Sequence, residues 1–275
     1  MAIDPTARVA DGARIGDGAE IGPYCLVGAD VELGQGVRLL AHVNVSGVTT
    51  IGEGTVVYPF ASLGTPPQSV QYRGGATQLI IGARCELREG VTMNRGTEDG
   101  GAVTRVGERC LFMVGCHVAH DCQVGDHVTF ANNVVLGGHV HIGDNAFLGG
   151  LVAVHQHGRV GESVMIGGMS AVRADVIPFG LARDDNLVGL NVVGLRRRGA
   201  THAGLQQLRK AYRALFFGDG VFADRIDAVA REFADDAAVG KIVAFIRAGS
   251  KRALMRPRQA PTERGEEGES DAEHG

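Results

Sequence analysis

Large apolar residues recur at every sixth position through the middle of the chain. The register runs without a gap from Val106 to Val172. Its members are Val106, Phe112, Val118, Val124, Phe130, Leu136, Ile142, Leu148, Val154, Val160, Ile166 and Val172. A period of six matches neither the turn of an α-helix nor the alternation of a single strand. A short fixed repeat of this kind predicts a solenoid in which each hexad places one large side chain inward.

The hexad pattern resembles that of the hexapeptide-repeat acyltransferases, whose fold is a left-handed parallel β-helix. In that fold three hexads form one triangular coil of 18 residues, so positions 18 apart stack at about 4.8 Å, the spacing of neighbouring strands. The left hand is implied by the resemblance alone, because the usual crossover rule favours the right hand.

Small residues complete each hexad. Glycine often follows the apolar position, and the fifth position is small or β-branched. All five cysteines occupy this fifth position: Cys25, Cys85, Cys110, Cys116 and Cys122. We therefore interpret the cysteines as small buried residues rather than as disulfide partners, metal ligands or catalytic thiols.

The same register begins near the N-terminus and is interrupted twice. It runs from Val9 to Leu63 and resumes at Ile81. Because Ile81 lies 18 residues after Leu63, we expect the first interruption, 64–80, to span the length of one coil. The second interruption, 96–105, is expected to add one residue to the repeat. Loops that leave a rigid scaffold commonly carry binding groups, so both segments are candidate walls of a cleft.

The period changes to that of helices near the C-terminus. Thr201 is a predicted N-cap and Gly218 a predicted end of the first of three helices. We therefore expect a β-helix over 1–190 with insertions at 64–80 and 96–105, and a helical domain over 191–256, joined by an irregular link. The charged, Gly-rich tail over 257–275 is expected to be disordered.

The composition narrows the class of protein. Glycine is plentiful at 42 residues and tryptophan is absent, which fits a core of small aliphatic layers. The net charge of −4 argues against a dedicated nucleic-acid binder. No apolar run approaches the roughly 18 residues of a membrane span. The repeat begins almost at the N-terminus and leaves no room for a signal peptide, so we expect a cytoplasmic protein.

Histidines concentrate in the most regular part of the repeat. Seven of the ten lie between His117 and His157, and none occupies the large apolar position, so they must point outward or lie at corners. Spacing of 18 defines two neighbouring columns: His120, Gly138 and Gln156 in one, and Asp121, His139 and His157 in the other. The sequence therefore predicts an imidazole, a glycine amide and several polar side chains on one small rigid surface.

Several separated motifs carry a more specific resemblance. They are MVGCHVAHDC over 113–122, the Asn132-Asn133 and Gly138-His139 pairs, and AVHQ over 153–156. Together they resemble the acyl-[acyl-carrier-protein]–UDP-N-acetylglucosamine O-acyltransferase family, which catalyses the first step of lipid A biosynthesis. The likeness covers about residues 3–255. It implies a cytoplasmic homotrimer that transfers a 3-hydroxyacyl chain from acyl carrier protein to the 3-hydroxyl of UDP-N-acetylglucosamine, with no cofactor and no metal.

Acyl transfer to a sugar hydroxyl needs a base for the hydroxyl proton, a donor for the oxyanion, and a partner that orients the base. The resemblance assigns these roles to His120, to the N–H of Gly138 and to Asp121. Substrate-contacting positions of the family correspond to Gln68, His117, His139, His155, Gln156 and Arg197. Gly168 matches the position that limits acyl-chain length, where a glycine leaves room for a longer chain.

Three positions depart from the family pattern. Gln71 stands where the first loop usually carries a lysine, Asn94 stands where a histidine is usual, and Asp184-Asp185 replaces a Gly-Asn pair. Loss of a phosphate-directed lysine is expected to weaken substrate binding rather than abolish the chemistry.

Other functions stay open at this point. A trimeric zinc enzyme of the γ-carbonic anhydrase type would bind its metal through three histidines, although His117 and His120 are three apart rather than the five of that motif. A non-catalytic scaffold and another hexapeptide sugar acyltransferase are further alternatives. Basic residues of the C-terminal helices form either a solvated face or a dock for an acidic acyl carrier protein: Arg209, Lys210, Arg213, Arg247, Lys251 and Arg252.

Overall fold

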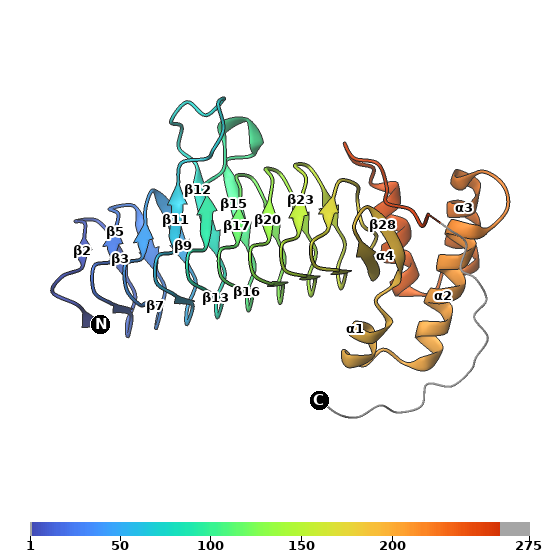
Figure 1. Cartoon of the computed structure of the whole chain (residues 1–275), viewed down its shortest axis with the longest axis horizontal. Helices are drawn as coiled ribbons and strands as arrows, with labels where there is room; N and C mark the ends of the chain where they lie inside the picture. Colours follow the sequence, from blue (N-terminus) through green and yellow to red (C-terminus); the bar gives the residue numbers. More distant parts are fainter. Residues whose placement is uncertain (1, 259–275) are drawn as a thin grey trace.

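Short strands from successive hexads go in turn to three sheets (Figure 1). The computed structural model describes residues 2–258, and within them the sheets contain eleven, nine and eight strands. The eleven-strand sheet consists of β1 (Ala2–Ile3), β4 (Glu20–Ile21), β7 (Arg38–Leu39), β10 (Val56–Val57), β13 (Glu86–Leu87), β16 (Leu111–Phe112), β19 (Thr129–Phe130), β22 (Phe147–Leu148), β25 (Met165–Ile166), β27 (Gly180–Arg183) and β28 (Asn186–Leu190).

The two other sheets complete each coil. The nine-strand sheet consists of β2 (Arg8–Val9), β5 (Leu26–Val27), β8 (Asn44–Val45), β11 (Ser62–Thr65), β14 (Thr92–Asn94), β17 (His117–Val118), β20 (Val135–Leu136), β23 (Ala153–Val154) and β26 (Ala171–Val172). The eight-strand sheet consists of β3 (Arg14–Ile15), β6 (Val31–Leu33), β9 (Val48–Ile51), β12 (Gln78–Ile81), β15 (Val103–Val106), β18 (Gln123–Val124), β21 (His141–Ile142) and β24 (Arg159–Val160).

Strand pairing follows the predicted spacing of 18. His117 pairs with Val135 and Val135 with Ala153, each in parallel register. Every large apolar residue of the register from Val106 to Val172 is at most 4% exposed. The inward positions predicted from the hexads are therefore confirmed, and they fill the interior between the three sheets.

Both insertions differ in length from the expectation. Ile81 pairs with Ile51, thirty residues earlier, so the first insertion adds twelve residues to one turn rather than spanning a whole coil. Val106 pairs with Ile81, twenty-five residues earlier, so the second insertion adds seven residues rather than one. The hexad period does not tell which of the three sheets the chain enters after a loop. These two predictions were wrong for that reason.

The insertions form two loops that project from the same edge of the coils, near β12 and β15 (Figure 1). The second loop contains the short 3-10 helix η1 (Glu98–Gly100). Glu98 joins the two loops, because its Oε1 accepts hydrogen bonds from the N–H groups of Gly75 at 2.7 Å and Arg73 at 3.2 Å.

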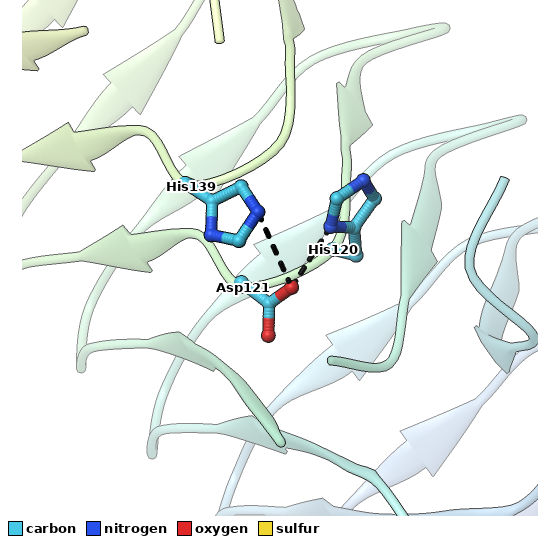
Figure 2. A group of neighbouring side chains, drawn as sticks. All are labelled: His120, Asp121 and His139. Carbon is cyan, nitrogen blue, oxygen red and sulfur yellow. Dashed lines mark hydrogen bonds and ion pairs between the residues drawn. The ribbon is translucent and has the colours of Figure 1, made fainter. Parts of the chain in front are cut away.

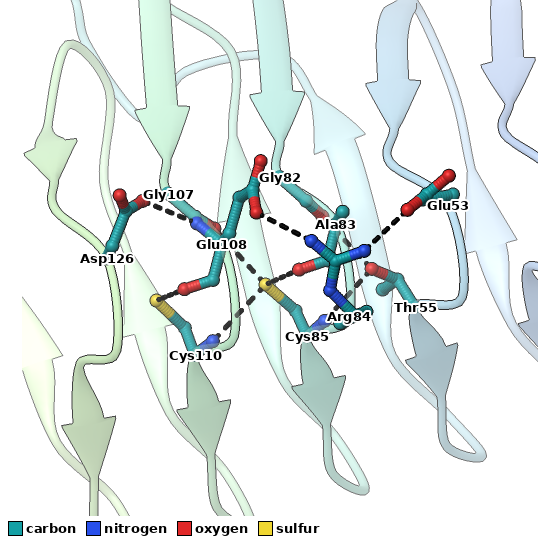
Figure 3. Close-up of polar contacts among 10 residues, drawn as sticks. All are labelled: Glu53, Thr55, Gly82, Ala83, Arg84, Cys85, Gly107, Glu108, Cys110 and Asp126. Carbon is teal, nitrogen blue, oxygen red and sulfur yellow. Dashed lines mark hydrogen bonds and ion pairs between the residues drawn. The ribbon is translucent and has the colours of Figure 1, made fainter.

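The corner between the eight- and eleven-strand sheets carries exposed charges above buried thiols (Figure 3). We call Glu53, Arg84, Glu108 and Asp126 the charged corner. Beneath it, the thiols of Cys85 and Cys110 donate to the carbonyl oxygens of Gly107 and Gly125, each at 3.2 Å. All five cysteines are buried and unpaired, as predicted, and burial raises the pKa of Cys116 to about 11 and of Cys122 to about 12.

The segment after the last coil is regular rather than irregular. The hairpin β27–β28 extends the eleven-strand sheet: β27 pairs with β25 in parallel, and β28 pairs with β27 in antiparallel register. Asp184 takes a φ of 55° at the turn of the hairpin. Because this hairpin lacks hexad spacing, the sequence pattern missed it. The helix α1 (Val192–Arg197) was missed as well, since six residues are too few to show helical periodicity.

Three longer helices follow and match those predicted: α2 (His202–Phe217), α3 (Phe222–Glu232) and α4 (Ala237–Arg247). Thr201 caps α2, because its Oγ accepts from the N–H of Gly204 at 3.1 Å, and Gly218 ends it. No helix in the described part of the chain has both the length and the apolar character needed to span a bilayer. The expectation for the tail 257–275 lies outside the described residues from position 259 onward.

Candidate active site

His120 and Asp121 lie at the corner between the nine- and eight-strand sheets, directly after β17 (Figure 2). The Asp121 side chain is fully buried, and the His120 side chain is 15% exposed. His120 Nδ1 lies 2.8 Å from Asp121 Oδ2. Since a carboxylate can only accept, Nδ1 carries the proton and Nε2 keeps its lone pair. The pair therefore presents a basic nitrogen away from Asp121.

The second insertion loop encloses the Asp121 carboxylate. Thr97 donates twice, from its N–H to Oδ1 at 3.0 Å and from its hydroxyl to Oδ2 at 2.6 Å. The N–H of Asp121 donates to Thr104 Oγ at 2.8 Å. A Cβ on Gly100 would lie 2.1 Å from Asp121 Oδ2, so only glycine lets the loop close this tightly. The loop thereby excludes water from the carboxylate while satisfying both of its oxygens.

Gly138 lies one coil away and packs against the His120 ring. A Cβ on Gly138 would come within 2.4 Å of His120 Cε1 and 2.7 Å of Nε2. The N–H of His139 donates to the carbonyl of His120, and that of His157 to Gly138, both at 2.9 Å. Within residues 2–258 the N–H of Gly138 makes no hydrogen bond, so it can donate to a ligand beside the imidazole. The two columns predicted from the spacing of 18 are present.

His139 and His157 continue the column above Asp121. Their rings stack with centroids 4.5 Å apart, and the edge of His139 meets His120 at 5.1 Å. Burial lowers the pKa of His139 despite the opposing charge of Asp121, and burial followed by the proximity of His139 lowers the pKa of His157. Both rings are therefore neutral near pH 7 and can act as hydrogen-bond partners.

Three side chains at this corner are close enough together to be considered as metal ligands. His120, Asp121 and His139 each offer one ligand atom, and these atoms lie within 4.8 Å of one another. The oxygens of Asp121 already accept from Thr97 and His120. This arrangement fits a base with its orienting carboxylate better than it fits a metal centre.

A cavity of about 530 Å³ opens in front of the pair. Its walls come from both insertion loops, the histidines and the segment after α4, and we call it the histidine cavity. Its lining residues include Gln71, Thr97, Asp99, His120, His139, His141, His157, Arg159 and Lys251. Of the predicted site residues, the cavity therefore brings together His120 and His139, next to the buried Asp121.

Four other predicted residues lie around this cavity without lining it. His117 Nδ1 lies 2.7 Å from Thr92 Oγ, and burial followed by the proximity of His120 lowers the pKa of His117. His155 and Gln156 both contact Arg252, whose guanidinium lies 2.6 Å from His155 Nδ1 and donates to Gln156 O at 2.9 Å. Gln68 is exposed in the first loop.

Two predicted residues are not brought to His120 within one chain. Arg197 on α1 lines a separate cavity of about 490 Å³ together with Phe147 and Met165. Gly168 lies at the corner between the eleven- and nine-strand sheets, between β25 and β26. A single copy of the chain therefore brings together the predicted catalytic groups but not the whole predicted substrate site.

Sequence reasoning missed Thr97 and Arg159, and it considered Lys251 only as part of a solvated face or of a dock for acyl carrier protein, not as a residue of this cavity. Arg159 stacks 18 residues after His141, so the column rule contained a signal for it. Thr97 and Lys251 reach the site from a loop and from the C-terminal segment, and no local pattern marks them. Of the family departures, Asn94 supports the first loop, donating to Thr65 Oγ at 2.9 Å and Pro66 O at 3.1 Å.

Comparisons with known proteins agree with one another. Residues 175–255 match the family described as Udp N-acetylglucosamine O-acyltransferase, domain 2, and residues 104–138 match the bacterial transferase hexapeptide repeat. An acyl-[acyl-carrier-protein]–UDP-N-acetylglucosamine O-acyltransferase of Azorhizobium caulinodans is 60% identical over 257 residues, 93% of this chain and 95% of that protein.

A second relative and a solved structure extend the likeness. The protein of the same description from Caulobacter vibrioides is 55% identical over 259 residues, 94% of this chain and 98% of its own length. The crystal structure of UDP-N-acetylglucosamine O-acyltransferase from Moraxella catarrhalis superposes with a TM-score of 0.90 at 37% identity, covering 93% of this chain and 100% of that one.

Proposed function

The chain belongs to the acyl-[acyl-carrier-protein]–UDP-N-acetylglucosamine O-acyltransferase family, and we propose that it transfers a 3-hydroxyacyl chain from acyl carrier protein to the 3-hydroxyl of UDP-N-acetylglucosamine. It is an acyltransferase, and this reaction begins lipid A biosynthesis. The observation that carries the proposal is that Nε2 of His120 lies beside the N–H of Gly138 and that neither group has a hydrogen-bond partner within residues 2–258. The zinc-enzyme alternative is not supported, because the relatives matched over nearly the whole chain are acyltransferases.

His120 is the proposed general base. Its Nε2 takes the proton of the sugar 3-hydroxyl while the oxygen attacks the thioester carbonyl. The C–S bond of the tetrahedral intermediate then breaks, the imidazolium returns the proton to the leaving sulfur, and the carrier protein leaves as the free thiol. Asp121 accepts from Nδ1, which fixes the tautomer and stabilises the imidazolium that forms. A positioned base of this kind contributes about 10²–10⁴-fold in rate.

Gly138 is the proposed oxyanion donor. The tetrahedral intermediate carries a negative oxygen, and a fixed backbone N–H directed at it contributes about 2.7–4 kcal/mol. Two features support the assignment to Gly138: its N–H has no acceptor within residues 2–258, and a side chain on it would collide with the His120 ring.

The sugar nucleotide is proposed to bind along the histidine columns. His117 and His139 flank His120, and His155 and Gln156 lie one coil beyond that of Gly138 and His139. Gln68 is proposed to reach the same ligand from the first loop. The lowered pKa values of His117 and His139 support neutral imidazoles that hydrogen-bond to the sugar rather than cations.

We propose a homotrimer of left-handed β-helices with clefts between adjacent copies. Exposed apolar side chains gather on the eleven- and nine-strand sheets and the corner between them, and we call them the apolar ridge: Tyr24, Leu26, Phe60, Val114, Val135, Phe147, Leu151 and Met169. In a trimer these side chains would be buried between copies, which explains why a single chain exposes so many apolar groups on one side. Gly168 lies at the same corner, between β25 and β26. We therefore propose that Gly168 contacts the end of the acyl chain, and Arg197 a phosphate, in a cleft between two copies.

The acyl carrier protein is proposed to dock on α2. Arg209, Lys210 and Arg213 are exposed there, whereas Arg247 is paired with Asp227 at 2.5 Å. Complementary charge speeds encounter with an acidic partner. Five unpaired cysteines support a reducing cytoplasmic location.

Product analysis tests the function. Purified protein is incubated with UDP-N-acetylglucosamine and a panel of 3-hydroxyacyl carrier proteins of different chain length, and the product is identified by mass spectrometry. The expected product is a single O-acyl ester that mild base hydrolyses. A 3-amino analogue of the sugar nucleotide serves as the control for an amide product. No ester with any donor would contradict the proposal.

A further inference from the structure

A lysine that the proposed reaction does not use lies in the histidine cavity. Lys251 follows α4 and lines the cavity together with His120, His139 and His157. Its charge acts on this cluster: after burial, the charge of Lys251 is among the influences that lower the pKa of His139 and of His157. Lys251 therefore places a positive charge within the space where substrate must lie.

The segment that carries Lys251 is fixed against the coils. The N–H of Asp175 donates to Ala253 O and the N–H of Met255 donates to Asp175 O, both at 2.8 Å. The neighbouring Arg252 donates to Gln156 O at 2.9 Å. These contacts fix the backbone directly after Lys251, which lines the cavity.

Within residues 2–258 Lys251 has no ion-pair partner, unlike Arg159, the other cation in the cavity wall. Arg159 Nε lies 2.7 Å from the buried carboxylate of Asp175, and its guanidinium lies 4.2 Å from the ring centroid of Phe245. Within residues 2–258 no carboxylate lies within 4.0 Å of the Lys251 ammonium. Lys251 is therefore available to a negatively charged ligand group, and Arg159 is not.

The same cavity is lined by Gln71. This position of the first loop carries glutamine where the family pattern has a lysine. The chain thus lacks a cation at the first-loop position of the cavity lining and has one in the segment after α4 that lines the same cavity. This juxtaposition suggests a compensating exchange within one site.

We propose that Lys251 binds a phosphate group of a substrate and takes the place of the loop cation absent at position 71. The inference rests on the proposed function. Two substrates carry such a group: the sugar nucleotide, in its diphosphate, and the acyl carrier protein, in its phosphopantetheine arm. A lysine ammonium binds phosphate as a compact point charge and tolerates either geometry.

Steady-state kinetics of Lys251→Gln tests the proposal. Because binding of a group remote from the reacting atoms is the same in the ground and transition states, the KM for one substrate is expected to rise about tenfold with kcat within about threefold. A rise for UDP-N-acetylglucosamine identifies the nucleotide diphosphate as the ligand. A rise for the acyl carrier protein that persists with free acyl phosphopantetheine identifies the phosphate of the arm.

Two further variants sharpen the test. Gln71→Lys in the Lys251→Gln background is expected to restore at least half of the lost affinity, since it returns a cation to the same cavity. Lys241→Gln removes an equal charge from the same part of the chain, where Lys241 pairs with Glu162 at 2.8 Å outside the cavity, and is expected to leave both KM values within twofold.

Two results overturn the proposal. One is KM values for both substrates in Lys251→Gln that equal those of Lys241→Gln. The other is a rise for the acyl carrier protein that vanishes with free acyl phosphopantetheine, because the protein surface and not a phosphate is then recognised. Failure of the proposed function is seen separately, as a wild-type protein without product. Calorimetric binding of UDP-N-acetylglucosamine and of free acyl phosphopantetheine to both lysine variants then decides the inference by the same tenfold criterion.

Discussion

Two corners of the same coils share a backbone geometry but differ in their exposure to water. At the corner with His120, Asp121 takes a φ of 60° and its side chain is fully buried (Figure 2). At the charged corner, Arg84 takes a φ of 55° and pairs with Glu53 and Glu108, all three being 44–56% exposed (Figure 3). Both corners belong to the same regular coils, so the hexapeptide repeat alone does not create a functional site.

The two corners differ because segments outside the repeat cover the His120 corner and leave the charged corner exposed. We call these segments, the second insertion loop and the segment after α4, the cover. Thr97 and Gly100 close the second loop over Asp121, and Lys251 lines the cavity in front of His120. Exposed ion pairs such as those of Arg84 contribute about 0–1 kcal/mol. A buried carboxylate held by fixed donors cannot relax, so it fixes the neighbouring imidazole. The chemistry of this protein therefore depends on segments that leave the repeat.

Matched Asp→Asn changes at the two corners give the largest predicted contrast. Asp121→Asn is expected to lower kcat at least about 100-fold, because an amide that donates to His120 Nδ1 moves the proton to Nε2 and removes the base. Asp126→Asn, whose exposed carboxylate accepts from the N–H of Glu108 at 2.7 Å, is expected to stay within about twofold. Equal losses in the two variants, measured as initial rates of ester formation, would contradict the comparison.

Thr97 tests the contribution of the cover itself. Thr97→Val removes the hydroxyl that donates to Asp121 Oδ2 at 2.6 Å, and we expect kcat to fall about tenfold with KM little changed. Thr97→Ser keeps the donor and is expected to recover most of the rate. A general loss of folding would lower activity in both variants and appear in their thermal unfolding, whereas a positioning role spares the serine variant.

Arg84→Ala probes the charged corner. Removing its pairs with Glu53 and Glu108 is expected to change the free energy of unfolding by less than about 1 kcal/mol, because all three groups are exposed and screened. Activity is expected to stay within twofold of the wild type. Denaturant unfolding and the ester assay measure the two quantities, and a loss of several kcal/mol would show that this corner is more than a solvated surface.

The smallest predicted effect is a pH dependence from His117. Burial lowers its pKa in the folded state, so below about pH 6.5 the unfolded chain binds more protons at this residue than the folded one. This contribution to stability is present above pH 6.5 and is lost as the pH falls through the lowered pKa. His117→Asn is therefore expected to lose less thermal stability than the wild type between pH 7 and pH 5, and an unchanged slope would argue against a neutral His117.

The sequence predicted the regular part of the molecule and the columns of the site. Hexad spacing is local, and it placed Phe112, Phe130 and Leu148 inward and His139 above Asp121 correctly. The cover could not be predicted, because its contacts join distant segments. Thr97 meets Asp121 across 24 residues, and Arg252 meets His155 across 97. Such contacts depend on loop lengths, and the hexad count misjudged both insertions.

The most direct test of the central claim is the turnover of His120→Ala compared with the wild type at the same oligomeric state, measured by ester formation and light scattering. The His120 side chain is partly exposed at a corner and makes no contribution to the core, so the variant is expected to fold and assemble normally. If His120 is the general base, kcat falls at least about 100-fold. Near-wild-type turnover in a correctly folded and assembled His120→Ala protein would contradict it.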